Sequence, residues 1–231
     1  MKFYILTLFP EMVEGVLDTS ILKRAREAGC IDFDAVNIRN YTLDKHNKVD
    51  DYPYGGGAGM VMQAQPIYDA YNAVCERAGH RVPCYYMTPQ GKLFEQADAR
   101  KLAQEQDICL LCGHYEGVDE RVLEAICDGY FSIGDYVLTG GELPALVMID
   151  AISRMVPGVL TNAESGEDES LENNLLEYPQ YSRPECWEGR NVPPILLSGD
   201  HAKVDQWRLE QSIERTRLRR PDLYQKYLEN Q

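Results

Sequence analysis

The stretch Ile108-Cys109-Leu110-Leu111-Cys112-Gly113-His114-Tyr115-Glu116-Gly117 decides the fold class. Its first half is a short apolar run bounded by a turn signal, a pattern typical of a fully buried strand. Strands buried on both faces occur in parallel sheets that helices cover on each side. Its second half is a glycine-bearing loop at the carboxyl end of that strand, where ligands bind in open α/β sheets.

The rest of the first 160 residues repeats this alternation of strand and helix. Helical spacing separates short β-branched or aromatic runs, so we expect an α/β fold, a mostly parallel sheet with helices on both faces. The expected strands are Phe3–Leu8, Phe33–Ile38, Cys84–Met87, Ile108–Cys112 and Tyr130–Leu138. The expected helices are Glu11–Ala28 (broken near Thr19-Ser20), Pro66–Ala78, Phe94–Glu105, Val118–Cys127 and Leu143–Met155, with Gly29, Gly79 and Gly129 ending three of them.

The composition changes after Pro157-Gly158 to serine, glycine, asparagine and acidic residues without apolar periodicity. We therefore expect a first domain over 1–160, a flexible acidic linker over 161–174 and a small helical domain over 175–231. The amphipathic stretches in this last domain are Asp205–Arg219 and Asp222–Leu228.

The net charge of −14 argues against a nucleic-acid partner, but the average conceals an asymmetry. Residues 161–180 hold six acids and no base, whereas residues 201–231 hold seven bases against five acids. Arg215, Arg219 and Arg220, together with Arg217, form a basic cluster that suits RNA phosphates. A solvated helix face with local ion pairs is the alternative.

Membrane insertion and metal binding find no support in the chain. No run of 18 or more apolar residues occurs, so we expect a soluble, cytoplasmic protein with no membrane partner. The lone pair Cys109 and Cys112 should point to opposite faces of a strand, and the four histidines are isolated. We therefore predict no metal site and no catalytic histidine.

Glycines gather in three loops at one predicted sheet edge: Pro89–Gly91, Gly113–Gly117, and Ile133–Leu138 followed by Gly140-Gly141. Free main-chain groups in such loops could read an adenine edge, although plain turns would use the same residues. A fourth run, Asp51–Met60, could cradle a phosphate, cover a pocket or be a mobile loop. Neither dinucleotide nor P-loop glycine motifs are present, which weakens a flavodoxin-like or other nucleotide-binding alternative.

The chain resembles the bacterial tRNA (guanine-N1)-methyltransferases of the SPOUT class over nearly its whole length. The resemblance depends on six motifs in the right order: Leu8–Met12, Asp51–Met60, Gly113–Gly117, Ile133–Pro144 with Arg154, Pro157–Leu160 and Leu175–Pro184. It implies a trefoil knot in the first domain, S-adenosylmethionine as methyl donor, and a homodimer with active sites at the subunit interface. The implied reaction methylates N1 of the guanosine at position 37 of tRNA, next to the anticodon.

The resemblance also assigns residues. The implied cofactor-binding residues are Met87, Pro89, Gly91, Gly113, Tyr115, Glu116, Ser132, Ile133, Gly134, Asp135, Tyr136, Val137, Leu138, Gly140, Gly141 and Pro144. The implied catalytic residues are Arg154, which faces guanine O6, and an acid before Ser170, which takes the N1 proton. That acid is Glu169 where the family more often has aspartate, and the neighbouring Asp168 is the alternative.

Two other functions stay open from the sequence. A SPOUT-class enzyme that methylates another RNA site, such as a ribose 2′-hydroxyl, would not need Glu169. A non-enzymatic module would use the acidic linker and the helical C-terminal domain to bind a protein.

Overall fold

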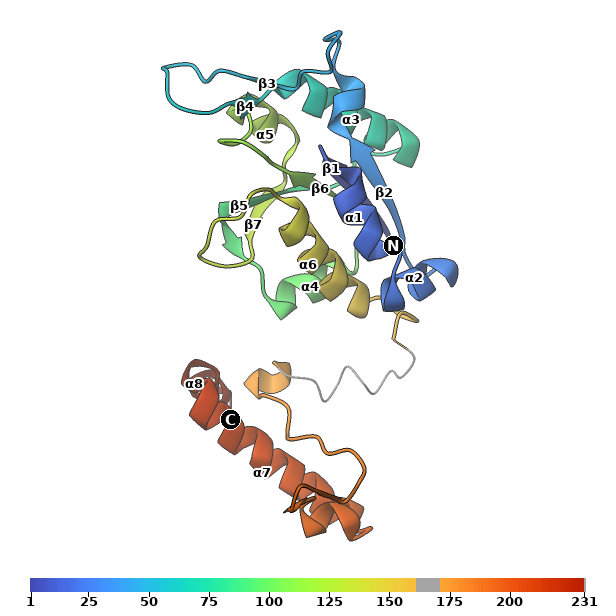
Figure 1. Cartoon of the computed structure of the whole chain (residues 1–231), viewed down its shortest axis with the longest axis vertical. Coiled ribbons are helices and arrows are strands. Elements are labelled where there is room, and N and C mark those ends of the chain that lie inside the picture. Colours follow the sequence, from blue (N-terminus) through green and yellow to red (C-terminus); the bar gives the residue numbers. More distant parts are fainter. Residues whose placement is uncertain (161–170, 231) are drawn as a thin grey trace. The chain divides into compact units, whose positions relative to one another are not determined.

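The computed structural model describes residues 1–160 and 171–230. Contacts between α-carbons divide the chain into two compact units, Met1–Thr161 and Asn162–Gln231 (Figure 1). Residues 161–170, most of the predicted acidic linker, lie outside the described part of the chain. Each unit is therefore considered by itself.

The first unit is built on a five-stranded sheet. Its strands run in the order β2-β1-β6-β5-β7, and every pair is parallel. They span Lys2–Thr7 (β1), Asp32–Asn37 (β2), Cys84–Leu93 (β5), Asp107–Cys112 (β6) and Gly129–Ser132 (β7). The predicted α/β class with a mostly parallel sheet is confirmed.

Helices cover both faces of this sheet, as expected (Figure 1). One face packs against α1 (Pro10–Leu17), α2 (Ser20–Glu27), α4 (Gln96–Leu102) and α6 (Glu142–Arg154). The other packs against α3 (Ala64–Ala78), α5 (Glu120–Ile126) and the 3-10 turn η1 (Ile38–Tyr41). The central strands β1 and β6 are buried along almost their whole length, which explains their continuous apolar sequences.

The two cysteines of β6 point to opposite faces of the sheet. Cys112 belongs to one hydrophobic cluster and Cys109 to the other, as the spacing predicted. Burial, together with the nearby Glu142 carboxylate, raises the pKa of the Cys112 thiol well above its ordinary value, so the thiol is protonated at neutral pH. Within residues 1–160 and 171–230, no group of three or more metal-ligating side chains occurs.

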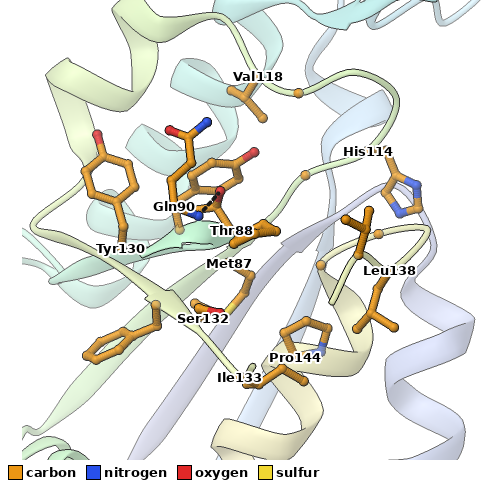
Figure 2. A pocket seen from close by; sticks show the side chains of 18 of the residues that line it. Met87, Thr88, Gln90, His114, Val118, Tyr130, Ser132, Ile133, Leu138 and Pro144 are labelled. Atoms are coloured by element: carbon orange, nitrogen blue, oxygen red, sulfur yellow. Dashed lines mark hydrogen bonds between the residues drawn. The ribbon is translucent and has the colours of Figure 1, made fainter. Parts of the chain in front are cut away.

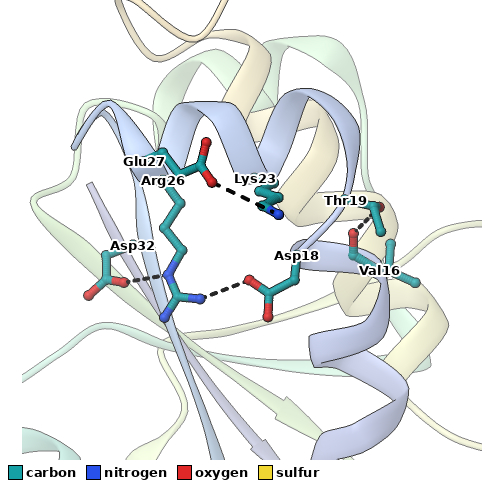
Figure 3. A network of polar contacts seen from close by, with 7 residues as sticks. All are labelled: Val16, Asp18, Thr19, Lys23, Arg26, Glu27 and Asp32. Atoms are coloured by element: carbon teal, nitrogen blue, oxygen red, sulfur yellow. Dashed lines mark hydrogen bonds and ion pairs between the residues drawn. The ribbon is translucent and has the colours of Figure 1, made fainter.

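The predicted break in the first helical stretch lies at Asp18-Thr19, between α1 and α2. Arg26 bridges Asp18 and Asp32 at 2.9 and 3.3 Å (Figure 3). Its guanidinium lies 4.1 Å from the centre of the Phe33 ring. The Thr19 hydroxyl donates to the Val16 carbonyl at 2.6 Å. These contacts join the end of α1, α2 and the edge strand β2.

Three boundaries differ from the prediction. Strand β5 continues past Met87 to Leu93, because its backbone bulges and then pairs again with Phe131 of β7. Helix α4 accordingly begins only at Gln96, where Glu95 and Asp98 form a capping box. Gly129 does not end a helix but begins β7, since α5 already ends at Ile126.

The glycine-rich run after Asp51 connects the two strands of a short antiparallel hairpin. Strand β3 (Asp50–Asp51) pairs with β4 (Val61–Met62), and Gly55, Gly56, Gly57 and Gly59 between them have positive φ angles. The amide of Glu116 donates to the Met60 carbonyl and that of Met62 to the Gly117 carbonyl, both at 2.9 Å. The hairpin is thus fixed to the loop that follows β6.

The second unit contains two C-terminal helices and a short hairpin. Helix α7 spans His201–Arg219, α8 spans Pro221–Glu229, and β8 (Cys186–Trp187) pairs with β9 (Arg190–Asn191). Helix α7 begins four residues before the predicted start, because Asp200 caps it by accepting a hydrogen bond from the Lys203 amide. Two 3-10 turns complete the described elements, η3 (Glu172–Asn174) and η4 (Pro194–Leu197).

The bulge in β5 generates a stability prediction. A Cβ atom added at Gly91 would lie 2.5 Å from the Phe131 nitrogen, so Gly91→Ala forces β5 and β7 apart. We expect a loss of about 1–3 kcal/mol in the free energy of unfolding, measured by urea denaturation. Gly129→Ala is the matched control, since its Cβ would meet only the Tyr85 side chain at 3.4 Å. Equal losses in the two variants would contradict this account.

Candidate functional site

A cavity of about 640 Å³ opens at the carboxyl ends of β5, β6 and β7. Figure 2 shows His114 and Leu138 on one side of it and Tyr130 on the other. Its walls come mainly from four segments: 86–90 of β5, 113–118 after β6, 130–134 of β7 and its continuation, and 136–141 with Pro144 at the start of α6. Glu120 and Leu123 of α5 also line it. This is the edge at which the sequence placed its three glycine loops.

Most of the predicted cofactor-binding residues line this one cavity. They are Met87, Pro89, Gly113, Tyr115, Glu116, Ser132, Ile133, Gly134, Tyr136, Val137, Leu138, Gly140, Gly141 and Pro144. Two do not: Gly91 backs onto Phe131 within the sheet, and the exposed Asp135 is not among the lining residues.

The segment Ile133–Leu138 is a loop and not the strand that its apolar pattern predicted. Strand β7 ends at Ser132, whose hydroxyl accepts from the Gly134 amide at 3.2 Å and donates to the Gly134 carbonyl at 3.0 Å. The turn that results leaves Tyr136 and Val137 54% and 86% exposed. The apolar side chains of this loop therefore border the cavity, and only Ile133 among them also packs against the hydrophobic core.

A main-chain hydrogen bond between two glycines, Gly113 and Gly141, joins two of the segments that line the cavity. The Gly141 amide donates to the Gly113 carbonyl at 3.0 Å, which joins the start of α6 to the end of β6. A Cβ atom at Gly141 would lie 2.6 Å from the Cys112 Cα, a distance that real contacts do not reach. Only glycine permits this approach, so this part of the rim is formed by backbone.

Several lining residues were not among those assigned to cofactor binding from the sequence. They are Tyr86, Thr88, Gln90, His114, Gly117, Val118, Glu120, Leu123, Tyr130, Phe131 and Thr139. Tyr86 and Thr88, the neighbours of Met87 in β5, could have been predicted, because successive side chains of a strand point to opposite faces and both faces of β5 border the cavity here. Burial raises the pKa of Tyr86 to about 12, so its hydroxyl is a neutral hydrogen-bonding group in the wall.

His114 is not isolated, contrary to the sequence interpretation. Its Nε2 lies 2.7 Å from Oε2 of Glu142, the first residue of α6. His80 likewise contacts Asp107 at 3.0 Å, away from the cavity, and this contact raises the pKa of His80. Both partners are at least 27 residues away along the chain, so spacing could not reveal them.

Arg154 does not line the cavity of its own chain. It ends α6, whose first residues border the cavity, and twelve residues of helix rise by about 18 Å. Arg154 shares a helix face with Leu143 and Val147, since the spacings of 11 and 7 residues return to one side. Leu143 and Val147 are about half exposed.

The remaining predicted site residues lie in or after the linker. Glu169 and Asp168 fall outside the described residues. In α7, Arg215 directs a nitrogen to the Glu177 carbonyl at 3.5 Å, and Arg220 forms a two-pronged ion pair with Asp222. Arg219 is exposed and makes no ion pair with another described residue. The structure therefore does not gather the three arginines into one free cluster.

None of the described helices combines the length and the hydropathy that crossing a bilayer requires.

Comparison with known proteins gives matches along almost the entire chain. A family model described as tRNA (Guanine-1)-methyltransferase TrmD matches residues 1–226. A tRNA (guanine-N(1)-)-methyltransferase of Lachnospira eligens is 57% identical over 228 residues, covering 99% of this chain and 97% of the relative. Proteins of the same name from Clostridioides difficile and Staphylococcus carnosus are 56% and 53% identical. Each of these two alignments covers 98% of this chain, and 98% and 92% of the relative.

Proposed function

The chain belongs to the tRNA (guanine-1)-methyltransferase family, and from this we propose that it transfers a methyl group from S-adenosylmethionine to N1 of the guanosine next to the anticodon of tRNA. The observation that carries the proposal is the backbone-rimmed cavity at the ends of β5, β6 and β7, in a chain that matches the family from residue 1 to residue 226.

The cavity suits a methyl donor that contains adenine and a sulfonium. Its volume of about 640 Å³ falls within the range of small-molecule sites. Exposed apolar side chains such as Val137 and Leu138 offer a surface for a planar ring. Main-chain amides and carbonyls in the loops around Gly113 and Gly140 can read the edge of that ring without a charged side chain.

The chemistry needs a base and a stabiliser of negative charge. Guanine N1 carries a proton in the neutral base, and S-adenosylmethionine supplies an electrophilic methyl group. We assign Glu169 as the base that takes the N1 proton, with Asp168 as the alternative. Arg154 would face the negative charge that develops on O6 as the proton leaves. Glu169 and Arg154 thus act on the target base and the cavity holds the donor.

The position of Arg154 supports a homodimer in which each subunit completes the other's site. A two-fold axis that pairs α6 with its copy in antiparallel fashion would bring Arg154 of one subunit to the cavity end of the other helix. Leu143 and Val147 on the same face of α6 are 50% and 49% exposed, and Met12 and Val16 on the neighbouring α1 are 43% and 47% exposed. These four side chains form an apolar face suited to such an interface.

The connections around the cavity support the trefoil knot that the resemblance implies. After β7 at the sheet edge, the chain returns past the end of β6 and enters α6, which packs over β1 and β6. On this path the main chain at Gly141 passes directly against the main chain at Gly113, which follows β6. The extended end of β5 pairs with β7 beyond the bulge, beside the segment that returns.

The second unit is proposed to bind tRNA phosphates through α7. The two cations of the predicted cluster proposed to contact the phosphates are the exposed Arg219, which makes no ion pair with another described residue, and the adjacent Arg220. Arg220 would exchange its ion pair with Asp222 for a phosphate.

Methyl transfer to an unmodified tRNA transcript tests the function directly. We expect one product, 1-methylguanosine next to the anticodon, identified by mass spectrometry of the nucleosides. A 2′-O-methylated nucleoside would instead support the other SPOUT-class reaction, and saturable binding of S-adenosylmethionine at one site per subunit would exclude a purely protein-binding module.

The base assignment predicts that Glu169→Gln lowers kcat by about 100-fold or more, because the amide cannot take the N1 proton. Asp168→Asn is the matched control and should retain most of the activity. Full activity in Glu169→Gln with loss in Asp168→Asn would show that the assignment is wrong by one residue.

The proposed dimer face predicts that Val147→Glu shifts the protein from dimer to monomer, because it buries a charge in an apolar contact. Sedimentation velocity measures the change, and we expect transfer activity to fall with the dimer population. Leu43→Glu is the control, since Leu43 is 98% exposed and lies on neither α1 nor α6. A Val147→Glu protein that remains dimeric would refute this face.

The proposed RNA contact predicts weaker tRNA binding when Arg219 and Arg220 are both replaced by Glu. We expect about a tenfold loss in affinity at moderate salt and a shallower dependence of affinity on salt concentration. The double variant Lys23→Glu, Arg24→Glu on α2 introduces the same charge change elsewhere as a control. If both double variants bind tRNA alike, α7 has no special part in phosphate binding.

A further inference from the structure

A buried hydrogen-bonded chain that the proposed chemistry does not use adjoins the cavity through His114. Glu142, at the first position of α6, is 1% exposed, and both of its carboxylate oxygens are occupied. The Thr7 hydroxyl donates to Oε1 at 2.6 Å, and His114 Nε2 contacts Oε2 at 2.7 Å. We propose that His114 is a positioning residue for the methyl donor, holding the glycine rim of the cavity in place through Glu142.

The cost of burying a carboxylate makes this arrangement specific. An ionised carboxylate loses its hydration in the interior and must recover hydrogen bonds from the protein. Thr7 supplies one from the end of β1, and the His114 ring supplies the other from the loop after β6. The N-terminal end of α6 adds a favourable dipole. The position of the imidazole is therefore tied to that of the helix start.

The His114 ring is also held by its other neighbours. It packs edge-on against Phe9, with the ring centres 4.9 Å apart, and the His114 amide donates to the Met62 sulfur at 3.2 Å. The side chain is 14% exposed, and its free side borders the cavity. His114 thus contacts Phe9 just before α1, Met62 of the β3–β4 hairpin and Glu142 of α6, while facing the space in which the donor would lie.

The pair sets the shape of the rim because Gly140 lies directly against it. A Cβ atom at Gly140 would be 2.3 Å from His114 Cε1 and 2.7 Å from Glu142 Oε2. The next residue, Gly141, hydrogen-bonds to Gly113 across the rim. Any movement of the imidazole or the carboxylate would therefore displace the backbone of residues 139–141, whose main-chain atoms are proposed to hold the donor.

This inference rests on the proposed function, since it concerns the same cavity and the same donor. The alternative is a histidine that merely satisfies a buried carboxylate and contributes to stability alone. The two differ in their readouts: a positioning residue changes donor affinity, whereas a purely structural one changes only the melting temperature.

The test compares His114→Ala, His114→Gln and the wild-type protein. Calorimetry gives the Kd for S-adenosylmethionine, steady-state assays give KM and kcat, and thermal unfolding gives the stability. We expect His114→Ala to raise both Kd and KM for the donor about tenfold with kcat changed less than about threefold. His114→Gln should return the Kd to within about threefold of wild type, because its amide can donate to Glu142.

His80→Ala is the matched control. His80 forms the other histidine–carboxylate pair of this unit, at 3.0 Å from Asp107, and it does not line the cavity. We expect its donor affinity to equal that of wild type even if its melting temperature falls. A His114→Ala protein with wild-type Kd and KM overturns the inference, as does a His114→Gln protein that binds no better than His114→Ala.

A second variant decides the matter if His114→Ala does not fold. Glu142→Gln keeps the size of the side chain and an oxygen for Thr7 but removes the charge that holds the imidazole, so we expect weaker donor binding. Wild-type affinity in Glu142→Gln would overturn the inference. A wild-type protein that fails to bind S-adenosylmethionine would instead overturn the proposed function, and with it this role of His114.

Discussion

The close approach of Gly141 to Gly113 is the constraint on which the rest of the site depends. One main-chain hydrogen bond of 3.0 Å joins the start of α6 to the end of β6, and no side chain fits between them. The four cavity segments surround this junction. Because α6 also packs on β1 and β6, the same contact connects the hydrophobic core to the rim where we propose that the donor binds.

Much of the fold was predictable from the local sequence pattern. Buried parallel strands have continuous apolar sequences, and the helices between them have apolar residues at helical spacing. The loop after Ser132 was not predictable, since Ile133, Tyr136 and Leu138 carry the same apolar signal as a strand. Only a side-chain turn at Ser132, which depends on the hydroxyl geometry, ends β7 there. The extension of β5 was missed for a related reason: a bulge lets a strand continue through proline and glycine.

In the candidate site, too, the features set by local sequence were predictable, whereas contacts between residues far apart in the chain were not. The glycine loops could be placed at one sheet edge from the sequence, because parallel strands bring their carboxyl ends together. Glu142 pairs with His114, 28 positions away, and with Thr7, 135 positions away, so no spacing rule reveals these contacts. Arg154 lies where the predicted helix Leu143–Met155 placed it, at the far end of α6 from the cavity, whereas its proposed role at the target base came only from the resemblance.

Where the rim of the cavity is formed by glycine, as at Gly113, Gly140 and Gly141, there is no side chain for mutation to alter. An inhibitor that copied the main-chain hydrogen bonds of the donor would meet atoms that every amino acid possesses, at positions such as Gly141 where any larger residue disrupts the packing. Resistance could not easily arise by substitution at those contacts. It would have to come from the apolar loop around Val137, whose side chains are free to change, and drug design against this pocket should therefore avoid relying on them.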